Sequence, residues 1–392
     1  MALGKKIPVA FTFANAGQDW HGGLNYFRSL FLALQAEPGC MVEPVAFFGT
    51  RTDLTAYAFP SNVRVVTDTV FDRRSPAWLL NKFATSVFGV PWVTNRVIRQ
   101  SGAAITSHDA PSGSPALKSI GWIPDFQHLH LPEFFSEAEL SKRSSQFREL
   151  VKKCDLIVVS SVSALQDLEQ FVPGSSAKVR VLRFCAVRPD LDAGAGVDLS
   201  ALYGANAPYF YLPNQAWAHK NHLTAIRALA ELLRERPDVK VICSGSLSDY
   251  RNPDHLDKLR AEIAKHGLEE RFVLLGLIPY PHIAQLMMQS VAVINPSLFE
   301  GWSTTVEEAK ALGVPLILSD IAVHREQCPI GEARFFEPLV PASLAAAMRA
   351  SLESVYGPAE RDPASALEAH RTRMIAFARN YERIVSELQD TR

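Results

Sequence analysis

The sequence predicts an α/β protein with two doubly wound domains, and three observations lead to this prediction. The chain has 392 residues, which is long enough for more than one sizeable core. Short β-branched and aromatic runs alternate with segments of helical period, as in βαβ units that build parallel sheets. The alternation lapses between residues 188 and 207, which indicates a linker between two domains.

The first domain is expected over residues 1–190. Its candidate strands are short apolar, β-branched and aromatic runs at 9–13, 45–48, 63–66, 120–123, 156–160 and 179–184. Its candidate helices carry apolar residues at helical spacing and lie at 24–34, 137–152 and 163–171.

The second domain is expected over residues 207–372, after a linker at 191–206 that is rich in Pro, Asp, Gly and Ala. Its candidate strands lie at 209–212, 239–243, 272–275, 291–295 and 316–319, and its candidate helices at 221–235, 255–266, 281–290 and 306–312. An amphipathic helix at 366–388 closes the chain. Because ligands of open α/β sheets bind at the carboxyl ends of the strands, we expect the functional site between the two domains.

Composition and charge exclude several classes of protein. Hydrophobic residues make up 47% and charged residues 21%, which excludes a disordered or low-complexity chain. The 40 basic and 41 acidic residues nearly cancel, so no global field favours nucleic acid as a partner. Five scattered cysteines favour a reducing compartment over a disulfide framework or structural zinc. With no apolar run of 18 residues and no signal-type N-terminus, we expect a cytoplasmic protein.

The most informative stretch is residues 295–315. A predicted strand ends at Asn295, and a turn containing Gly301 leads into a helix that ends at Gly313. Free N–H groups at the start of this helix make an anion site suited to a phosphate. Three hydroxyl residues offer N-caps there: Ser303, Thr304 and Thr305.

Two carboxylates flank this predicted phosphate site. Glu300 lies in the turn and Glu308 in the first helical turn, where both can accept hydrogen bonds from ligand hydroxyls. This combination indicates a ligand that carries phosphate and several hydroxyls. The alternative stays open that Glu307 and Glu308, each three residues after a threonine, complete capping boxes.

The runs Phe299-Glu300-Gly301, Glu308-Ala309 and Gly313-Val314-Pro315 resemble the Glu-x7-Glu signature of the retaining nucleotide-sugar glycosyltransferases of family four. The resemblance extends over almost the whole chain and implies the GT-B fold, with two Rossmann-like domains facing across a cleft. It further implies that residues 373–392 form a C-terminal helix that crosses back to the N-terminal domain. It also implies that Glu300 faces the donor sugar and that Glu308 binds ribose hydroxyls. The diphosphate contacts that it implies are Ser303, Thr304 and Thr305.

The activity implied by this resemblance is transfer of a sugar, with retention, from a nucleotide diphosphate sugar to an acceptor hydroxyl. The acceptor would be a saccharide or a lipid-linked molecule, in bacterial polysaccharide or glycolipid assembly. The resemblance also suggests a front-face route, in which the leaving phosphate takes the proton of the acceptor.

A second match to the family lies at residues 212–222. Lys220 stands at a strand-to-helix junction, where its charge would stabilise a departing diphosphate. Asn214 and Gln215 are expected donor contacts, but Gln215 stands where the family usually carries an arginine, five residues before the lysine. A second positive charge is therefore missing or comes from elsewhere.

Three further loops are expected to contact the donor. Gly22 and Gly23 follow the first strand and match a family glycine pair that lets donor phosphates and acceptor approach; they form neither a Walker A loop nor a dinucleotide fingerprint. Gly245 lies in a turn at the rim of the second domain. Leu277 and Ile278 lie in a loop that resembles the base-binding loop of the family.

The first domain is also expected to contribute catalytic residues. Asp125 follows a predicted strand and matches the aspartate of a family histidine-aspartate pair, whose histidine position is Pro124 here. His128 or His130 takes the place of that histidine, or neither does. The expected catalytic residues are Glu300, Lys220, Asp125 and His128.

We expect neither a metal nor a cofactor. The Asp-x-Asp sequence at 190–192 falls in the predicted linker and not after a buried strand, so it is interpreted as an ordinary loop. The charge of Lys220 and the start of the helix after Gly301 would do the work of a cation.

The segment 71–100 combines five basic residues with several aromatic ones. Two interpretations stay open: a packed helix pair with a solvated basic rim, or a peripheral contact with the inner face of an anionic membrane. The second would suit a lipid-linked acceptor.

Two other functions also stay open. A GT-B nucleotide-sugar epimerase or hydrolase would convert the donor without an acceptor. A catalytically silent sugar-nucleotide or glycan-binding protein would explain Gln215 and Pro124, where the family carries charged or catalytic side chains.

Overall fold

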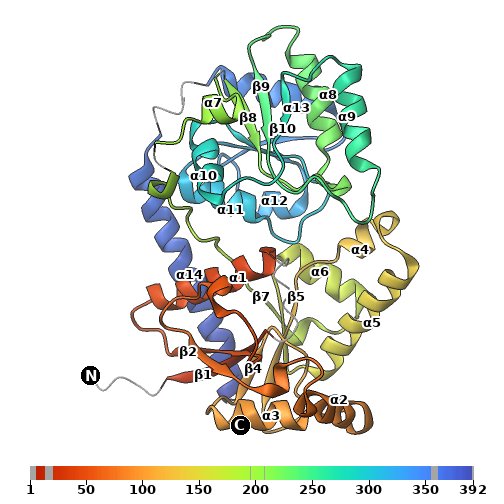
Figure 1. Ribbon diagram of the computed structural model, residues 1–392, viewed down its shortest axis with the longest axis vertical. Coiled ribbons are helices and arrows are strands. Elements are labelled where there is room, and N and C mark those ends of the chain that lie inside the picture. Colours follow the sequence, from red (N-terminus) through yellow and green to blue (C-terminus); the bar gives the residue numbers. More distant parts are fainter. Residues whose placement is uncertain (1–5, 14–20, 195, 207, 355–360, 391–392) are drawn as a thin grey trace. The chain divides into compact units, whose positions relative to one another are not determined.

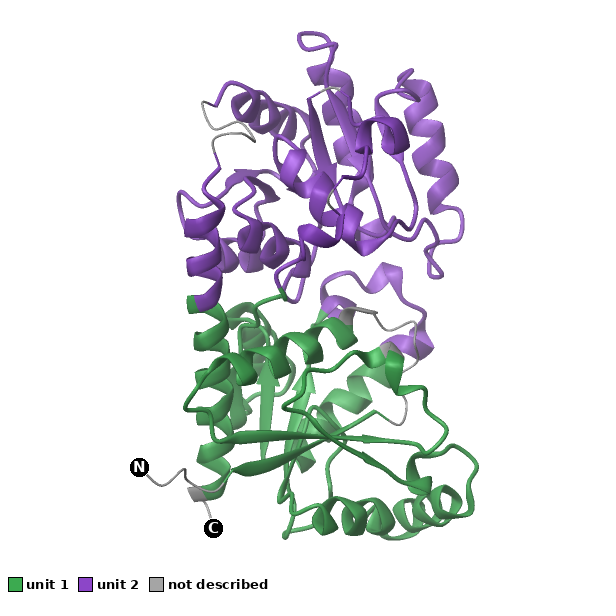
Figure 2. Ribbon diagram, turned by 60° about the vertical axis from the view of Figure 1, so that its left-hand side comes forward, with its two compact units in different colours: residues 1–126, 141–187, 372–392 green, residues 127–140, 188–371 purple. Residues whose placement is uncertain are grey.

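The computed structural model describes residues 6–13, 21–194, 196–206, 208–354 and 361–390. The chain divides into two compact units, which Figure 2 colours separately. The first comprises Met1–Phe126, Ser141–Val187 and Thr372–Arg392, and the second comprises Gln127–Leu140 and Arg188–Arg371. Each unit contains one parallel sheet with helices around it (Figure 1), so the predicted class of two doubly wound α/β domains is confirmed.

The first unit has a seven-stranded sheet with the order β3-β2-β1-β4-β5-β6-β7. The chain builds outward from β1 to one edge and then returns to place β4 on the other side of β1, which is the doubly wound pattern. The strands are β1 (Ile7–Thr12), β2 (Val42–Phe48), β3 (Arg64–Thr67), β4 (Ile105–Ser107), β5 (Lys118–Ile123), β6 (Leu156–Val159) and β7 (Val179–Val181). The helices along this part of the chain are α1 (His21–Ala36), α2 (Pro76–Phe88), α3 (Trp92–Gln100), α5 (Glu137–Lys153) and α6 (Val162–Phe171).

The second unit has a six-stranded sheet with the order β10-β9-β8-β11-β12-β13. The order reverses between β8 and β11, so the loops after these two strands meet at the switch point where ligands of such sheets bind. The strands are β8 (Tyr209–Leu212), β9 (Lys240–Cys243), β10 (Phe272–Leu274), β11 (Val293–Asn295), β12 (Leu316–Ser319) and β13 (Arg334–Phe336). The helices are α4 (Gln127–His130), α7 (Leu199–Tyr203), α8 (His222–Leu232), α9 (His255–Lys265), α10 (Tyr280–Gln289), α11 (Thr304–Leu312), α12 (Ala322–Gln327) and α13 (Pro341–Leu352).

The last helix, α14 (Pro363–Asp390), is shared by the two units. Its residues up to Arg371 belong to the second unit, and those from Thr372 onward belong to the first. Residues at helical spacing on α14 are buried in the core of the first unit, where the Phe377 ring lies 6.1 Å from the Tyr26 ring. These residues are Phe377, Tyr381, Ile384 and Leu388.

Several elements lie where the sequence analysis expected none. β4 and β13 have only three residues each, too few to show a period. The stretch expected to be a linker carries α7, which the Asp198 side chain caps and which ends at Gly204 with a φ of 66°. Leu199 on this helix is 2% exposed and packs in the core of the second unit, so α7 is part of that unit.

Three smaller findings concern the expectations from composition. None of the described helices is both long and apolar enough to cross a membrane. All five cysteines are buried and free. Asp190 Oδ1 accepts hydrogen bonds from the backbone N–H groups of Asp192 and Ala193, so the Asp-x-Asp sequence forms a turn.

Candidate functional site

The loops that follow β8 and β11 are joined by hydrogen bonds at the switch point of the second sheet. The Asn214 amide donates to Asn295 Oδ1 at 3.1 Å, and the backbone N–H of Leu298 donates to the carbonyl of His219 at 2.8 Å. Asn295 ends β11 and is fully buried. The two stretches that carried the sequence resemblance, 212–222 and 295–315, therefore form one site.

The centre of this site is a buried ion pair. Lys220 Nζ lies 2.6 Å from Glu300 Oε1, and the side chains are 18% and 10% exposed. The hydroxyl of Ser297 lies 2.7 Å from the same carboxylate oxygen. Glu300 Oε2 accepts no hydrogen bond from the described residues and stays available to a ligand hydroxyl.

The pKa of Glu300 shows which interaction dominates. Burial, the largest single effect, would by itself raise this pKa. The charge of Lys220, a smaller effect of His324 and the hydrogen bonds from Lys220 and Ser297 together outweigh burial and lower the pKa to about 2. Glu300 is therefore a carboxylate at every physiological pH.

Backbone strain fixes the position of Lys220. The lysine ends a short 3-10 helix, Ala218–Lys220, and the next residue, Asn221, has a φ of 56°. The Asn221 amide donates to the carbonyls of Pro296 and Pro338, at 3.1 and 2.7 Å, which holds the chain in this left-handed conformation. This backbone conformation places Lys220 where its Nζ reaches Glu300.

The start of α11 is fixed by the same network. Ser303 is the N-cap, because its hydroxyl accepts from the N–H of Val306, and the Asn295 amide donates to this hydroxyl at 2.8 Å. The Thr305 hydroxyl donates to Asn214 Oδ1 at 3.1 Å. The first-turn amides of Thr304 and Thr305 have no acceptor within the helix, as an anion site requires.

The capping-box interpretation of the acidic residues is wrong. With Ser303 as the N-cap, the residue at the third helical position is Val306, so neither Glu307 nor Glu308 occupies the position of a capping box. Glu307 instead accepts from the Gln327 amide at 3.1 Å.

The second carboxylate, Glu308, has the opposite electrostatic environment. It is 8% exposed and accepts a hydrogen bond from the Tyr280 hydroxyl at 2.9 Å. Burial raises the pKa of Glu308 to about 7, with only a partial opposing effect of Tyr280. The two predicted carboxylates thus differ in charge state near neutral pH.

The rim of this site contains the other predicted donor contacts. Leu277 is 80% exposed, next to the half-buried Ile278. A Cβ atom on Gly245 would lie 2.8 Å from backbone atoms of Asn214 and Gln215, so only glycine allows these loops to approach. The Gln215 side chain is exposed.

A guanidinium from the loop after β9 lies beside the chain that leads to Lys220. Arg251 lies 5.8 Å from the ring of Trp217, which is itself 5.6 Å from the ring of His219. Arg251 also stacks over the ring of Phe135 at 4.1 Å and over that of Tyr250 at 4.9 Å. Its side chain is 13% exposed and lies 3.9 Å from the Glu139 carboxylate. Burial lowers the pKa of His219 to about 3, and the charges of Lys220 and then Arg251 add to this effect.

The predicted histidines lie in α4, within the second unit. His128 is 1% exposed, and its ring faces that of Phe135 at 6.4 Å. His130 is exposed and its ring lies 5.0 Å from that of Phe299, next to Glu300 in the sequence. Of the two histidines, His130 is thus the one beside the Glu300 turn, and a catalytic role for either stays a prediction.

The remaining predicted residues belong to the first unit. Gly22 and Gly23 lie in the first turn of α1, and residues 14–20 before them lie outside the described residues. Asp125 follows β5 and accepts a hydrogen bond from Arg143 at 2.7 Å. The catalytic or donor-binding roles of these three residues stay predictions.

Sequence analysis missed several residues of this site. Tyr280, Arg251 and Gln327 come from loops and helix ends far from the two motifs, and no local pattern indicates their role. Asn295 and Ser297 carried a usable signal, because Asn295 ends a buried strand and Ser297 follows it. Among the described residues, no three His, Cys, Asp or Glu side chains are grouped to hold a metal ion, and metal-independent chemistry stays a prediction.

Glu308 should make stability depend on pH. Between its ordinary pKa of 4.5 and about 7, the folded chain holds a proton that the unfolded chain releases. The Glu308 contribution to the free energy of unfolding should therefore fall by about 3 kcal/mol as pH rises through this window. Buried histidines such as His219 and His222, whose pKa burial lowers, change stability in the opposite direction over the same pH range. The test is therefore the difference between variants: from pH 5 to pH 8, urea unfolding should show Glu308→Gln gaining stability relative to the wild type. The exposed-site control Glu353→Gln should follow the wild type, and a Glu308→Gln profile parallel to the wild type would contradict the account.

The comparisons with known proteins agree with this geometry. Residues 205–378 match the model of a family described as Glycosyl transferases group 1. The chain is 27% identical over 227 residues to a D-inositol 3-phosphate glycosyltransferase of Nocardia farcinica, covering 56% of this chain and 43% of that protein. It is 29% identical over 107 residues to the lipopolysaccharide core biosynthesis mannosyltransferase LpcC of Rhizobium leguminosarum, covering 27% of this chain and 30% of that one. The chain thus covers less than half the length of these two relatives.

Solved structures extend the likeness to the whole chain. HepE from Anabaena, in complex with UDP and glucose, has a TM-score of 0.66 at 16% identity and covers 97% of this chain and 100% of that one. Sucrose-phosphate synthase from Thermosynechococcus elongatus has a TM-score of 0.69 at 16% identity, covering 99% and 100%. The chain therefore has the GT-B fold, and its residues 205–378 match the Glycosyl transferases group 1.

Proposed function

We propose that the chain is a retaining glycosyltransferase that moves a sugar from a nucleotide diphosphate sugar to an acceptor hydroxyl. The observation that carries the proposal is the buried Glu300 carboxylate, which is ion-paired with Lys220 beside the start of α11 and near Glu308. The family match and the two curated relatives support the same class of reaction. These relatives also suggest bacterial polysaccharide or glycolipid assembly as the setting.

Lys220 suits the departing diphosphate. Its ammonium has three N–H donors, of which one serves Glu300, so two remain for phosphate oxygens. The free amides of Thr304 and Thr305 add neutral donors and the positive end of the helix dipole. We propose that these groups balance the charge that develops on the leaving group without a metal or cofactor.

Glu300 fixes the donor sugar through its free oxygen, Oε2, while Glu308 accepts from ribose hydroxyls in place of the Tyr280 hydroxyl. In the reaction, the bond between the anomeric carbon and the diphosphate oxygen breaks as a bond to the acceptor oxygen forms on the same face. The proton of the acceptor hydroxyl passes to the departing phosphate oxygen. Retention of configuration follows from this front-face geometry.

Arg251 provides the second positive charge that Gln215 lacks. It lies in the loop after β9, which is bonded to the Lys220 loop: the N–H of Ala218 and the N–H of Arg251 both donate to Asp249. Stacking on Phe135 and Tyr250 orients the guanidinium plane of Arg251, and the N–H groups at the edge of that plane are the donors for phosphate oxygens.

The experiment on this function begins with the donor. A thermal-shift screen of UDP, GDP, dTDP and ADP should identify the base, because a ligand of the native state raises its melting temperature. The reaction of the corresponding nucleotide sugar is then followed by nuclear magnetic resonance. The sugar in the product should keep the anomeric configuration that it has in the donor. Glu300→Gln and Lys220→Ala should remain folded and each lose about 100-fold or more in turnover.

The matched controls Glu337→Gln and Lys258→Ala remove the same charges at exposed positions and should keep wild-type turnover. Wild-type turnover in Glu300→Gln and Lys220→Ala, or an inverted product, would contradict the proposed function.

Arg251 should act on the phosphate groups and not on the base. Arg251→Gln should therefore weaken binding of the nucleoside diphosphate about 10-fold and leave binding of the nucleoside monophosphate within 2-fold. Isothermal titration calorimetry of both ligands measures this difference, with Arg260→Gln on the exposed face of α9 as the control. Equal weakening of both ligands would mean that Arg251 only supports the loop.

A further inference from the structure

The helices α2 and α3 of the first unit expose an unusual group of apolar side chains. Of the sixteen large hydrophobic residues that are exposed in the described chain, six lie within residues 79–92, each 53–62% exposed. We call this group the apolar face; it consists of Leu79, Leu80, Phe83, Val87, Phe88 and Trp92. Such a concentration marks an interaction surface, since single exposed apolar residues are normal but contiguous groups are not.

The apolar face is built on ordered structure. The Ser75 hydroxyl caps α2 by accepting from the N–H of Trp78, and the helix ends at Gly89 with a φ of 71°. Ala84 is the buried residue of α2. At the helix end, the rings of Phe88 and Trp92 stack at 4.6 Å and join α2 to α3. The apolar side chains are therefore carried by two ordered helices, of which α2 is capped at both ends.

Basic residues predominate in the chain around the apolar face. Residues 71–100 contain five basic side chains and one acidic residue, Asp72, which is buried and accepts hydrogen bonds from the Thr50 hydroxyl and the N–H of Arg51. All five are exposed, and within the described residues none of them forms an ion pair. They are Arg73, Arg74, Lys82, Arg96 and Arg99. An uncompensated charge of this size beside exposed apolar side chains favours an anionic and apolar partner.

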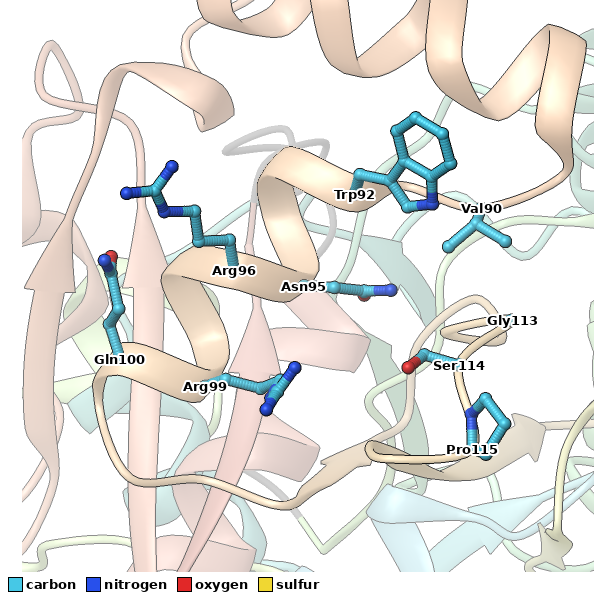
Figure 3. A pocket seen from close by; sticks show the side chains of 9 residues that line it. All are labelled: Val90, Trp92, Asn95, Arg96, Arg99, Gln100, Gly113, Ser114 and Pro115. Carbon is cyan, nitrogen blue, oxygen red and sulfur yellow. The ribbon is translucent and has the colours of Figure 1, made fainter.

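A cavity of about 570 Å³ lies against the same helices, between α3 and the loop at 113–115 (Figure 3). Trp92, Arg96 and Arg99 lie at i, i+4 and i+7 on α3 and line it. Asn95 donates to the carbonyl of Ser112 at 2.8 Å, which holds the facing loop. Figure 3 shows Arg99 extending from α3 on the side that faces Ser114. One guanidinium binds two phosphate oxygens through parallel N–H donors, so the side of the cavity that Arg99 faces suits a phosphate headgroup.

We propose that the apolar face docks the chain on the surface of an anionic lipid bilayer. The apolar side chains enter the boundary between headgroups and acyl chains, as on interfacial amphipathic helices. The five basic residues, Arg96 among them, attract the anionic surface, and Arg99 binds a lipid phosphate at the cavity. A second copy of the chain is a poorer occupant, because a symmetric contact would bring five positive charges against five others.

Vesicle flotation of the full chain tests this proposal. We expect binding to vesicles of 70% phosphatidylcholine and 30% phosphatidylglycerol, and at least 10-fold weaker binding to phosphatidylcholine alone or in 0.5 M NaCl. Arg96→Gln/Arg99→Gln should weaken binding to the anionic vesicles about 30-fold. Leu80→Ser/Phe83→Ser should weaken it at least 10-fold. All these positions are exposed, so melting temperatures should stay at the wild-type value.

The control Lys142→Gln/Lys152→Gln removes two exposed charges from α5 and should bind like the wild type. Several outcomes would overturn the proposal: equal binding to both kinds of vesicle, wild-type binding by either variant of the apolar face, or equal loss in the α5 control. Sedimentation velocity gives one further outcome that would overturn the proposal. If the wild type forms a dimer, does not bind vesicles, and is dissociated by Leu80→Ser/Phe83→Ser, then the apolar face binds a second copy of the chain and not a bilayer.

Discussion

The buried ion pair between Lys220 and Glu300 joins the loops after β8 and β11, and the arrangement of the site depends on it. A charge with so little exposure is costly to bury alone, and the attraction between the two side chains offsets part of that cost. The effect is visible in the pKa of Glu300, which falls although burial opposes that change. The pair also sets the orientation of Glu300, since one carboxylate oxygen is bound to the lysine and the other accepts no hydrogen bond from the described residues.

Neutral groups around the ion pair keep its geometry. Asn214 and Asn295 bond to each other, and through Thr305 and Ser303 they also bond to the start of α11. Such fixed dipoles need no reorganisation when charge develops on a leaving group. Glu308 forms no ion pair with the described residues and has the raised pKa expected of a buried carboxyl group. Two carboxylates of one motif thus acquire different charge states from their surroundings, as separate roles for sugar and ribose would require.

Local patterns predicted a large part of this architecture, and non-local contacts explain what they missed. The turn and helix from Asn295 to Gly313 could be predicted because caps and a left-handed glycine act within a few residues. Eighty residues separate Lys220 from Glu300, so their ion pair follows from the sheet order and not from a local pattern. Arg251 and Tyr280 come from neighbouring loops in the same way. The capping-box alternative required Thr304 or Thr305 to be the N-cap, one or two residues after the actual N-cap, Ser303. Sequence alone does not fix a helix start to that precision.

The dependence of the site on the ion pair can be measured by a double-mutant cycle. The free energy of unfolding is determined by urea titration for the wild type, Lys220→Met, Glu300→Gln and the double variant. Each single variant leaves a buried group without its charged partner. The losses in free energy of unfolding of the two single variants, added together, should therefore exceed the loss in the double variant by about 2 kcal/mol or more. Losses that add to within about 0.5 kcal/mol would show that the two charges act independently, and would contradict the account.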